Sequence, residues 1–489
     1  MNSKHTMRRI AYCSPVNPVE SGISDYSEEL LPYLGQYAEV VLFVERGLVP
    51  ANLQVREHLT IRTLDELPDL QRKQPFDAVL YHMGNSPAHG TIYELLQRIP
   101  GVVVLHDWVL HHFKLWHAAE RRKDIGEYLR EMQRRYGGHP LGMGERVARK
   151  MSRGQLQDAA FQFPLVEDVI ERAQGLIGHS RFVVEQARAL RPSLAAAVVP
   201  MGVPLPPALP RDEARQQLGL PLDAPIWASF GHINPYKRME SALRAFRRFR
   251  TEYASARYIL VGSVSPSYDL AALIRRLGLD DAVVVTGYAP RADFERYVAA
   301  ADLCLNLRWP TAGETSASLL RLLGAGRPTL VSAVGAFVEL PDDVCAQVDV
   351  DWSEAALILA YARLFQQQPA VAVQLGNNAR AFVAREHTLQ GAAQGYIRFL
   401  ADRFGWGEMP RLRDVLWQVE DAEAAPIAAP AQAEPAGVAA LPAPIATTIA
   451  EVGAAAAEIG VQETDEHLLG DVAATLGDLL DEPPPQRHA

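Results

Sequence analysis

The stretch DLCLNLRWPTAGETSASLLRLLGAGRPTLVS, residues 302–332, contains the pattern that decides the fold. It begins with an apolar run at 303–307 and ends with another at 329–332. Between these runs lie a polar loop and a segment of helical periodicity at 317–323. Two apolar runs joined through a helix are typical of a βαβ unit, in which the two strands are parallel.

The same alternation continues on both sides of this stretch. Further apolar runs lie at 9–13, 40–44, 76–81, 102–106, 175–179, 226–230, 258–261 and 283–286, with helical patterns such as 26–37 and 240–249 between them. A Pro-rich segment at 204–210 interrupts the series. The sequence therefore predicts an α/β fold of two doubly wound, Rossmann-like domains, at residues 1–205 and 206–395. A helical segment at 396–420 is expected to pack back on the first domain.

The acidic net charge of −10 comes from the end of the chain. From residue 422 onward there are eleven Asp and Glu residues against Arg487 alone, so the rest of the chain is neutral. Net charge therefore says nothing about the partners of the folded part, among which we expect no nucleic acid. Residues 421–489 are rich in Ala, Pro and Glu and predict a disordered tail, with a protein partner as one possible role.

Three further features bear on the compartment. Cys13, Cys304 and Cys345 are isolated, which predicts buried, reduced thiols. The polar start has no apolar leader and no apolar stretch reaches about twenty residues, so we expect a cytoplasmic protein. Residues 112–153 form a basic helical insertion, either a solvated surface or a face for an anionic or lipid-phosphate acceptor at the inner membrane face.

Candidate site residues follow the predicted strands, because ligands of open α/β sheets bind beyond the carboxyl ends of strands. After the first strand, Gly22 and Asp25 lie in a loop that opens a helix without a GxGxxG motif. His106 and Asp107 end the run at 102–106. His111 and His112 follow, but no further ligands stand at a recognisable spacing, so we expect no metal.

The second domain supplies the charged candidates. Gly231, His232, Lys237 and Arg238 follow the strand at 226–230 and favour phosphate binding over a plain surface location. In the opening stretch, Thr315, Ser316 and the free amides of the helix start are suited to an anion, and Glu314 to sugar hydroxyls. An ordinary N-capped helix explains the same residues without a ligand.

Together these landmarks resemble a bacterial family 4 (group 1) glycosyltransferase of the GT-B fold over about residues 8–418. The matching segments, in order, are 21–27, Gly84-Asn85, 103–107, Gly231 through Lys237-Arg238, 313–328 and 335–341. The resemblance implies a nucleotide-sugar donor held between the domains and a saccharide or lipid-linked acceptor in surface polysaccharide biosynthesis. It implies that no cofactor or metal is needed and that anomeric configuration is retained.

The resemblance also implies roles for individual residues. Lys237 would neutralise the departing diphosphate, the Gly22 loop would lie beside that diphosphate, and His106 would face the transferred sugar. His232 stands where the family usually has Arg, and Arg238 is the candidate to replace that charge. Arg321 stands where the family has a ribose-binding glutamate, so the nucleotide contact and identity are open.

Two other classes of function fit parts of this pattern. A sugar-nucleotide epimerase shares the two-domain shape but would need acid/base carboxylates facing the sugar, for which Glu314 and Asp107 are the candidates. A catalytically degenerate scaffold acting through the acidic tail is the non-enzymatic alternative, and the presence of Lys237, Glu314 and His106 argues against it.

Overall fold

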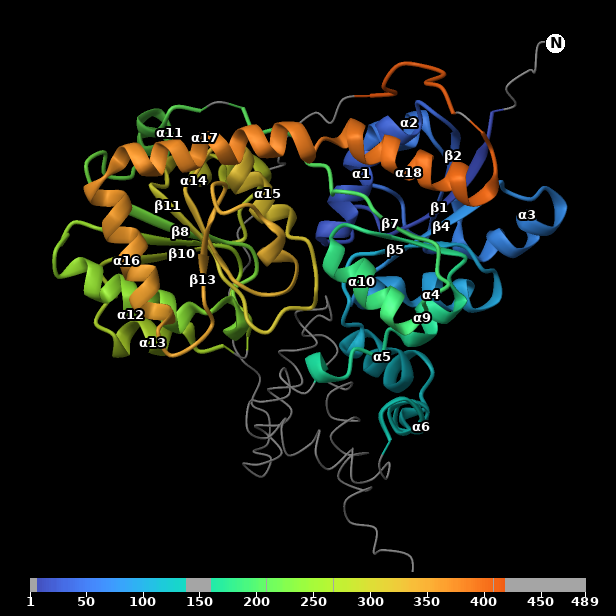
Figure 1. Cartoon of the computed structure of the whole chain (residues 1–489), viewed down its shortest axis with the longest axis horizontal. Coiled ribbons are helices and arrows are strands. Elements are labelled where there is room, and N and C mark those ends of the chain that lie inside the picture. Colours follow the sequence, from blue (N-terminus) through green and yellow to red (C-terminus); the bar gives the residue numbers. More distant parts are fainter. Residues whose placement is uncertain (1–6, 138–159, 208, 267, 408, 418–489) are drawn as a thin grey trace, which may run out of the picture.

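The computed structural model describes residues 7–137, 160–207, 209–266, 268–407 and 409–417. The predicted tail and much of the predicted basic insertion lie outside these residues. Within them the chain forms two α/β domains, each built on a fully parallel sheet (Figure 1). The predicted pair of doubly wound domains is confirmed.

The N-terminal sheet has seven strands in the order β3-β2-β1-β4-β5-β6-β7. Their bounds are β1 Arg9–Cys13, β2 Glu39–Val44, β3 Thr60–Thr63, β4 Ala78–Met83, β5 Val102–Leu105, β6 Gly175–Gly178 and β7 Ala196–Val198. The α-helices between them are α1 Gly22–Leu34, α2 Leu53–His58, α3 Leu67–Lys73, α4 Gly90–Arg98, α5 His111–Trp116, α6 Ile125–Tyr136, α9 Glu167–Arg172 and α10 Arg181–Leu190. Shorter turns are η1 Leu64–Glu66, η2 Pro87–His89 and the π-helical η3 His117–Arg121.

The C-terminal sheet has six strands in the order β10-β9-β8-β11-β12-β13. They are β8 Ile226–Phe230, β9 Arg257–Val261, β10 Val283–Gly287, β11 Leu303–Asn306, β12 Thr329–Ser332 and β13 Ala346–Val348. Its α-helices are α11 Arg211–Gln217, α12 Met239–Arg250, α13 Leu270–Arg276, α14 Arg291–Ala300, α15 Ala317–Gly324, α16 Glu354–Gln367 and α17 Pro369–Glu386, with the 3-10 turns η4 Pro235–Lys237 and η5 Gly335–Glu339. A last helix, α18 Leu389–Phe404, follows.

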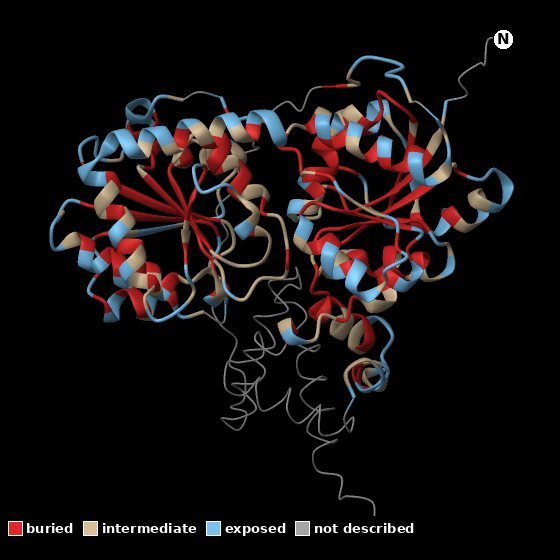
Figure 2. Cartoon of the chain, viewed as in Figure 1, coloured by how far each residue is buried: buried red, intermediate tan, exposed pale blue. Residues whose placement is uncertain are grey.

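Helices cover both faces of each sheet, so the central strands are buried on both sides, whereas the edge strands β3, β7 and β10 are partly exposed (Figure 2). Every residue of β4, β5 and β6 is buried. Continuous apolar runs are what a parallel sheet covered on both faces requires, and they made these strands predictable. Cys13, Cys304 and Cys345 are free and buried, as predicted.

Several predicted bounds are wrong. The helix predicted at 26–37 begins earlier, at Gly22, because the Ser21 side chain caps it by accepting from the Ser24 amide. The strand predicted at 76–81 lies at Ala78–Met83. The edge strands β3, β7 and β13 were missed because they have only three or four residues.

The chain crosses between the domains twice, and the two crossings lie side by side. The first follows β7 and the second joins α17 to α18. The amide of Val203 donates to the His387 carbonyl at 3.0 Å, and His387 Nδ1 lies 2.9 Å from the Met201 carbonyl. A Cβ on Gly202 would come within 2.6 Å of the Leu389 Cα, so only glycine fits at this contact.

Helix α18 lies on the N-terminal domain, where it packs against α1 and β6 (Figure 1). The Tyr26 hydroxyl on α1 donates to the Tyr396 hydroxyl on α18 at 3.2 Å. Both rings are fully buried in a core that continues into the C-terminal domain through Leu319 and Val383. The helix begins at Leu389, before the predicted start of the segment at 396.

No helix of the described residues combines the length and the apolar character needed to cross a bilayer.

Candidate active site

The two domains meet where the carboxyl ends of β5 and β11 face each other. The amides of Trp108 and Val109, just after β5, donate to the Ala312 carbonyl at 2.6 and 3.1 Å. Gly313 has φ +77°, and a Cβ there would lie 2.7 Å from the Trp108 Cβ. The loop that precedes Glu314 is therefore seated directly on the N-terminal domain, and glycine allows the close approach.

A second contact holds the same face together. Glu339, in η5 of the C-terminal domain, accepts from the amides of Arg181 and Phe182 at 2.9 and 2.6 Å. These amides are free donors at the start of α10, where a carboxylate is favoured by the helix dipole. A carboxylate of one domain thus caps a helix of the other.

Charged groups of the C-terminal domain gather beside this contact. Glu314 pairs with Arg308 and accepts from the Thr311 hydroxyl at 2.9 Å. Burial raises the pKa of Glu314, but the charge and hydrogen bonds of Arg308 outweigh it and hold this pKa below its usual range. Glu314 is therefore an ionised acceptor held in a fixed orientation.

Lys237 belongs to the same cluster. Burial, with the nearby Arg308 charge, lowers the pKa of Lys237 to about 7, although Glu314 opposes the shift. Lys237 ends η4, where the Asn234 side chain accepts from its amide. A Cβ on Gly231 would lie 3.6 Å from the Lys237 amine, so the glycine loop after β8 borders the same place. Perturbed pKa values of this kind are common at functional sites.

Arg308 was not predicted as a site residue, yet it contacts Glu314 and influences Lys237. Its Nη2 also lies 3.4 Å from the Ser316 hydroxyl. Its position in the sequence could have identified it, because Arg308 follows directly after the apolar run at 303–307. The other candidates were selected because they follow predicted strands in the same way.

Asp107 approaches this cluster from the N-terminal domain. It accepts from the Asn85 amide at 2.8 Å. Burial and the negative charge of Glu314 raise the pKa of Asp107 to about 7, although the Asn85 amide opposes the shift. The two carboxylates thus belong to different domains and have pKa values displaced in opposite directions, which separates their proton affinities.

His106 lies in a buried cluster of rings. Its Nε2 is 2.9 Å from His82 Nδ1, and its ring lies 5.0 Å from that of His179 and 5.7 Å from Tyr26. Burial, helped by the neighbouring histidines, lowers the pKa of His106 well below its usual value. His106 is therefore a neutral imidazole at the pH of the cell.

The remaining N-terminal candidates, Gly22 and Asp25, lie in the first turn of α1. Gly22 starts α1, and a Cβ there would meet no atom within 4 Å, so no protein group requires glycine at this position. Asp25, in the first turn of α1, accepts from the Asn17 side chain at 3.1 Å.

Ser316 is the N-cap of α15, as the ligand-free explanation predicts. Its hydroxyl accepts from the Leu319 amide at 3.2 Å, and Thr315 beside it is partly buried. The cap leaves Glu314 and Thr315 just outside the helix.

The structure corrects two ideas about charge. Arg238 does not replace the charge missing at His232, because its guanidinium holds the buried Glu354 at 2.6 and 3.0 Å. His232 instead faces Ser263, 2.9 Å from its hydroxyl, and both burial and Lys237 lower its pKa.

Arg321 also has a different partner from the one expected. It pairs with Glu29 of α1 in the other domain, and Arg291 contacts the same carboxylate at 3.2 Å. Two arginines of the C-terminal domain therefore share one carboxylate of the N-terminal domain.

Within the described residues, no group of three or more His, Cys, Asp or Glu side chains is placed to hold a metal ion. Whether the reaction needs a metal stays a prediction.

Known proteins resemble this chain in sequence and in fold. Residues 210–382 match the family model of glycosyl transferases group 1. The D-inositol 3-phosphate glycosyltransferase of Acidothermus cellulolyticus is 28% identical over an alignment of 222 residues, which covers 42% of this chain and 48% of that protein. This chain thus spans about half the length of that curated relative.

Solved structures show the same arrangement over most of the chain. The sucrose-phosphate synthase of Thermosynechococcus elongatus has a TM-score of 0.59 at 17% identity, over 81% of this chain and 99% of its own. Anabaena HepE in complex with UDP and glucose has a TM-score of 0.57 at 17% identity, over 81% and 100%. The chain thus has the GT-B fold of known glycosyltransferases, and its C-terminal domain matches the group 1 glycosyltransferase family.

Proposed function

We propose that the chain is a retaining glycosyltransferase that moves a hexosyl group from a nucleotide-diphosphate sugar to a saccharide or lipid-linked acceptor. The observation that carries this proposal is the group formed by Lys237, Arg308 and Glu314 at the strand ends where the two domains meet. Two cations and an oriented carboxylate suit a sugar attached to a leaving diphosphate. The similarity to Anabaena HepE, which was solved with UDP and glucose, supports this choice of donor.

Lys237 and Arg308 would stabilise the leaving group. When the bond between the sugar and the diphosphate breaks, negative charge grows on the phosphate oxygen, and preorganised cations stabilise that charge. A diphosphate beside Lys237 would raise the pKa of Lys237 from about 7, so the bound lysine is protonated when it is needed.

Glu314, His106 and Asp107 would act on the sugars. Glu314 is held by Arg308 and Thr311, so its carboxylate would accept hydrogen bonds from hydroxyls of the transferred sugar in a fixed direction. His106, as a neutral imidazole, donates or accepts one hydrogen bond at the same sugar. Asp107, with a pKa of about 7, is suited to take the proton of the acceptor hydroxyl.

The finer parts of the proposal rest on the family resemblance. They are retention of anomeric configuration, independence of metal and cofactor, a cytoplasmic or peripheral membrane location, and a role in surface polysaccharide biosynthesis. Turnover in the presence of EDTA and the anomeric proton signals of the product test the first two directly.

The deciding experiment is a thermal-shift screen of the full chain against UDP-, GDP-, ADP- and dTDP-sugars, followed by product analysis. We expect one nucleotide class to raise the melting temperature and to be consumed only when an acceptor is present. An epimerised nucleotide sugar formed without acceptor would overturn the proposal in favour of the epimerase. If removing residues 421–489 abolishes the biological role while turnover was never detectable, the scaffold explanation holds instead.

A further inference from the structure

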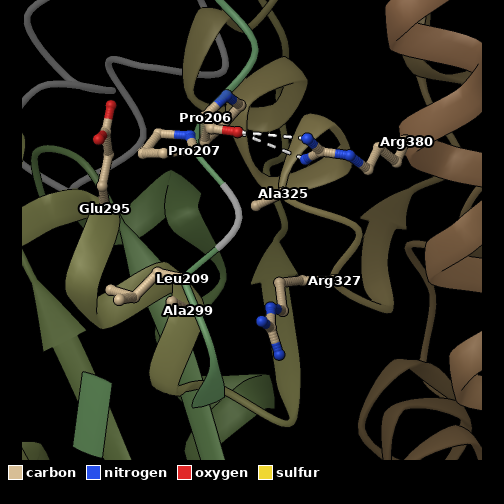
Figure 3. A pocket seen from close by; sticks show the side chains of 8 residues that line it. All are labelled: Pro206, Pro207, Leu209, Glu295, Ala299, Ala325, Arg327 and Arg380. Carbon is tan, nitrogen blue, oxygen red and sulfur yellow. Dashed lines mark hydrogen bonds between the residues drawn. The ribbon is translucent and has the colours of Figure 1, made fainter. Parts of the chain in front are cut away.

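A small cavity lies at the edge of the C-terminal sheet opposite the proposed active site. Its volume is about 160 Å³ (Figure 3). It is lined by the segment that enters the domain, by α14, by the turn between α15 and β12, and by α17; the residues are Pro206, Pro207, Leu209, Glu295, Ala299, Ala325, Arg327 and Arg380. Sites for drug-sized ligands are usually larger, so this one suits only a small molecule.

One wall of the cavity is formed by Arg327, whose side chain is partly buried. Arg327 extends from the start of β12 toward the side where Leu209 and Ala299 lie (Figure 3). Its Nε is buried without a hydrogen-bond partner, and its Nη1 reaches the Ala301 carbonyl only at 3.5 Å. Among the residues that the structure describes, no carboxylate forms an ion pair with Arg327. A guanidinium in this state retains donors for a ligand.

The carboxylate of Asp302, whose charge acts on Arg327, is already bound to other groups. Asp302 accepts from Arg215 at 2.7 Å, from Arg211 at 3.1 Å and from the Ile226 amide at 2.8 Å. Arg215 is fully buried and also donates to the carbonyls of Ala300, Leu222 and Ala224. Arg211 also pairs with Asp212 at 3.0 Å, so two carboxylates balance Arg211 and Arg215, and neither carboxylate is bonded directly to Arg327.

The opposite wall adds a second cation. Arg380 on α17 donates to the Gly324 carbonyl at 2.6 Å and reaches the Pro206 carbonyl at 3.4 Å. The negative group on the lining is Glu295, which pairs with Arg291 at 3.2 Å. The lining thus holds two guanidinium groups and one carboxylate, and Arg291 offsets the charge of that carboxylate only in part, because Arg291 also contacts Glu29.

We propose that this cavity is a binding site for a small anion of the phosphate class, either inorganic phosphate or the phosphate end of a small monoester. Arg327 would bind it through its guanidinium, whose Nε has no partner among the described residues, and Arg380 would contact it from the other wall. The anion would join α17, the α15–β12 turn and the entering segment, and so hold the region where the chain enters the domain. The site is distinct from the donor site, because Lys237 and Arg308 lie at the carboxyl ends of the strands.

Thermal shift of the full chain with inorganic phosphate tests the proposal, with sodium chloride keeping the ionic strength constant. We expect a saturable rise in melting temperature that persists in Lys237→Ala. In Arg327→Gln the phosphate concentration for half the effect should rise about tenfold or more, because a charge-assisted bond is lost. Glu295→Gln should lower that concentration, because a repelling carboxylate has been removed.

Arg380→Gln serves if Arg327→Gln does not fold, and it should weaken binding in the same direction. Glucose 6-phosphate in place of phosphate separates the two sources of the anion: a shift of equal size assigns the site to a monoester end, and a shift with phosphate alone assigns it to the free ion. The proposal is overturned if phosphate gives no saturable shift at constant ionic strength. A shift that is lost in Lys237→Ala but kept in Arg327→Gln also overturns it.

Discussion

The two domains contribute opposite kinds of chemistry to the place where they meet. The N-terminal domain offers groups of little charge, with the neutral imidazole of His106 among buried histidine and tyrosine rings and Asp107 only partly ionised near neutral pH, because its pKa is about 7. The C-terminal domain offers the charged group of Lys237, Arg308 and Glu314. This division suits a reaction in which charge develops on the donor phosphate while the sugar is held by hydrogen bonds.

The charged side should respond most to substitution. Lys237→Ala should lower the transfer rate by about 10²–10³-fold, because a preorganised cation for the leaving group is lost. The melting temperature should stay close to the wild-type value, since Lys237 is not part of the apolar core. Lys237→Arg is the matched control that keeps the charge. Normal turnover in Lys237→Ala would mean that this lysine of the C-terminal domain does not stabilise the leaving group.

The neutral side should instead be sensitive to acid. Burial lowers the pKa of His89 and of His179 to about 4, against a usual value of about 6.5. The unfolded chain therefore binds more protons between these values, so stability is full above about pH 6.5 and is lost as the pH falls toward 4. Each fully buried histidine of this kind contributes roughly 3 kcal/mol to that loss. Chemical denaturation between pH 7 and 4.5 measures it, and the slope should be reduced in His89→Gln.

A smaller effect on the transfer rate is expected from Glu314, whose charge acts on Asp107 of the other domain. Glu314→Gln should lower the transfer rate by about 10–100-fold and should also lower the pKa of Asp107, because the charge of Glu314 is one cause of its elevation. The acid limb of the rate profile should then move to lower pH. A reduced rate with an unmoved acid limb would mean that Asp107 is not the group that titrates.

The smallest expected effect on stability is that of Gly22→Ala, and Gly313→Ala serves as its contrast. Gly22→Ala should change stability by less than about 0.5 kcal/mol, because the added Cβ meets no atom of the described residues within 4 Å. If the donor approaches this loop closely, the same substitution should raise the KM for the donor. Gly313→Ala should destabilise the protein clearly, because φ is +77° and the Cβ would lie 2.7 Å from the Trp108 Cβ. Melting temperatures and donor KM values separate the two. If neither quantity changes in Gly22→Ala, the loop does not approach the donor.

The sequence was sufficient where local pattern decides structure. The apolar runs of β1, β5, β8 and β11 predicted both sheets. The rule of strand ends selected His106, Asp107, Lys237 and Glu314, whose roles stay predictions. The sequence was not sufficient where the two residues of an ion pair are far apart along the chain. Arg238 lies 116 residues from Glu354, and Arg321 lies 292 residues from Glu29, so neither pairing has a local signal.

The paired crossings near Val203 and His387 have an evolutionary consequence. The N-terminal domain is discontinuous in sequence, because its helix α18 is encoded after the whole C-terminal domain. A single recombination event between related genes, at the segment 204–210, would join α1 to an α18 that evolved against a different surface. Exchange of intact domains therefore requires two breakpoints, one at each crossing, and the contact between Tyr26 and Tyr396 must be inherited from one parent.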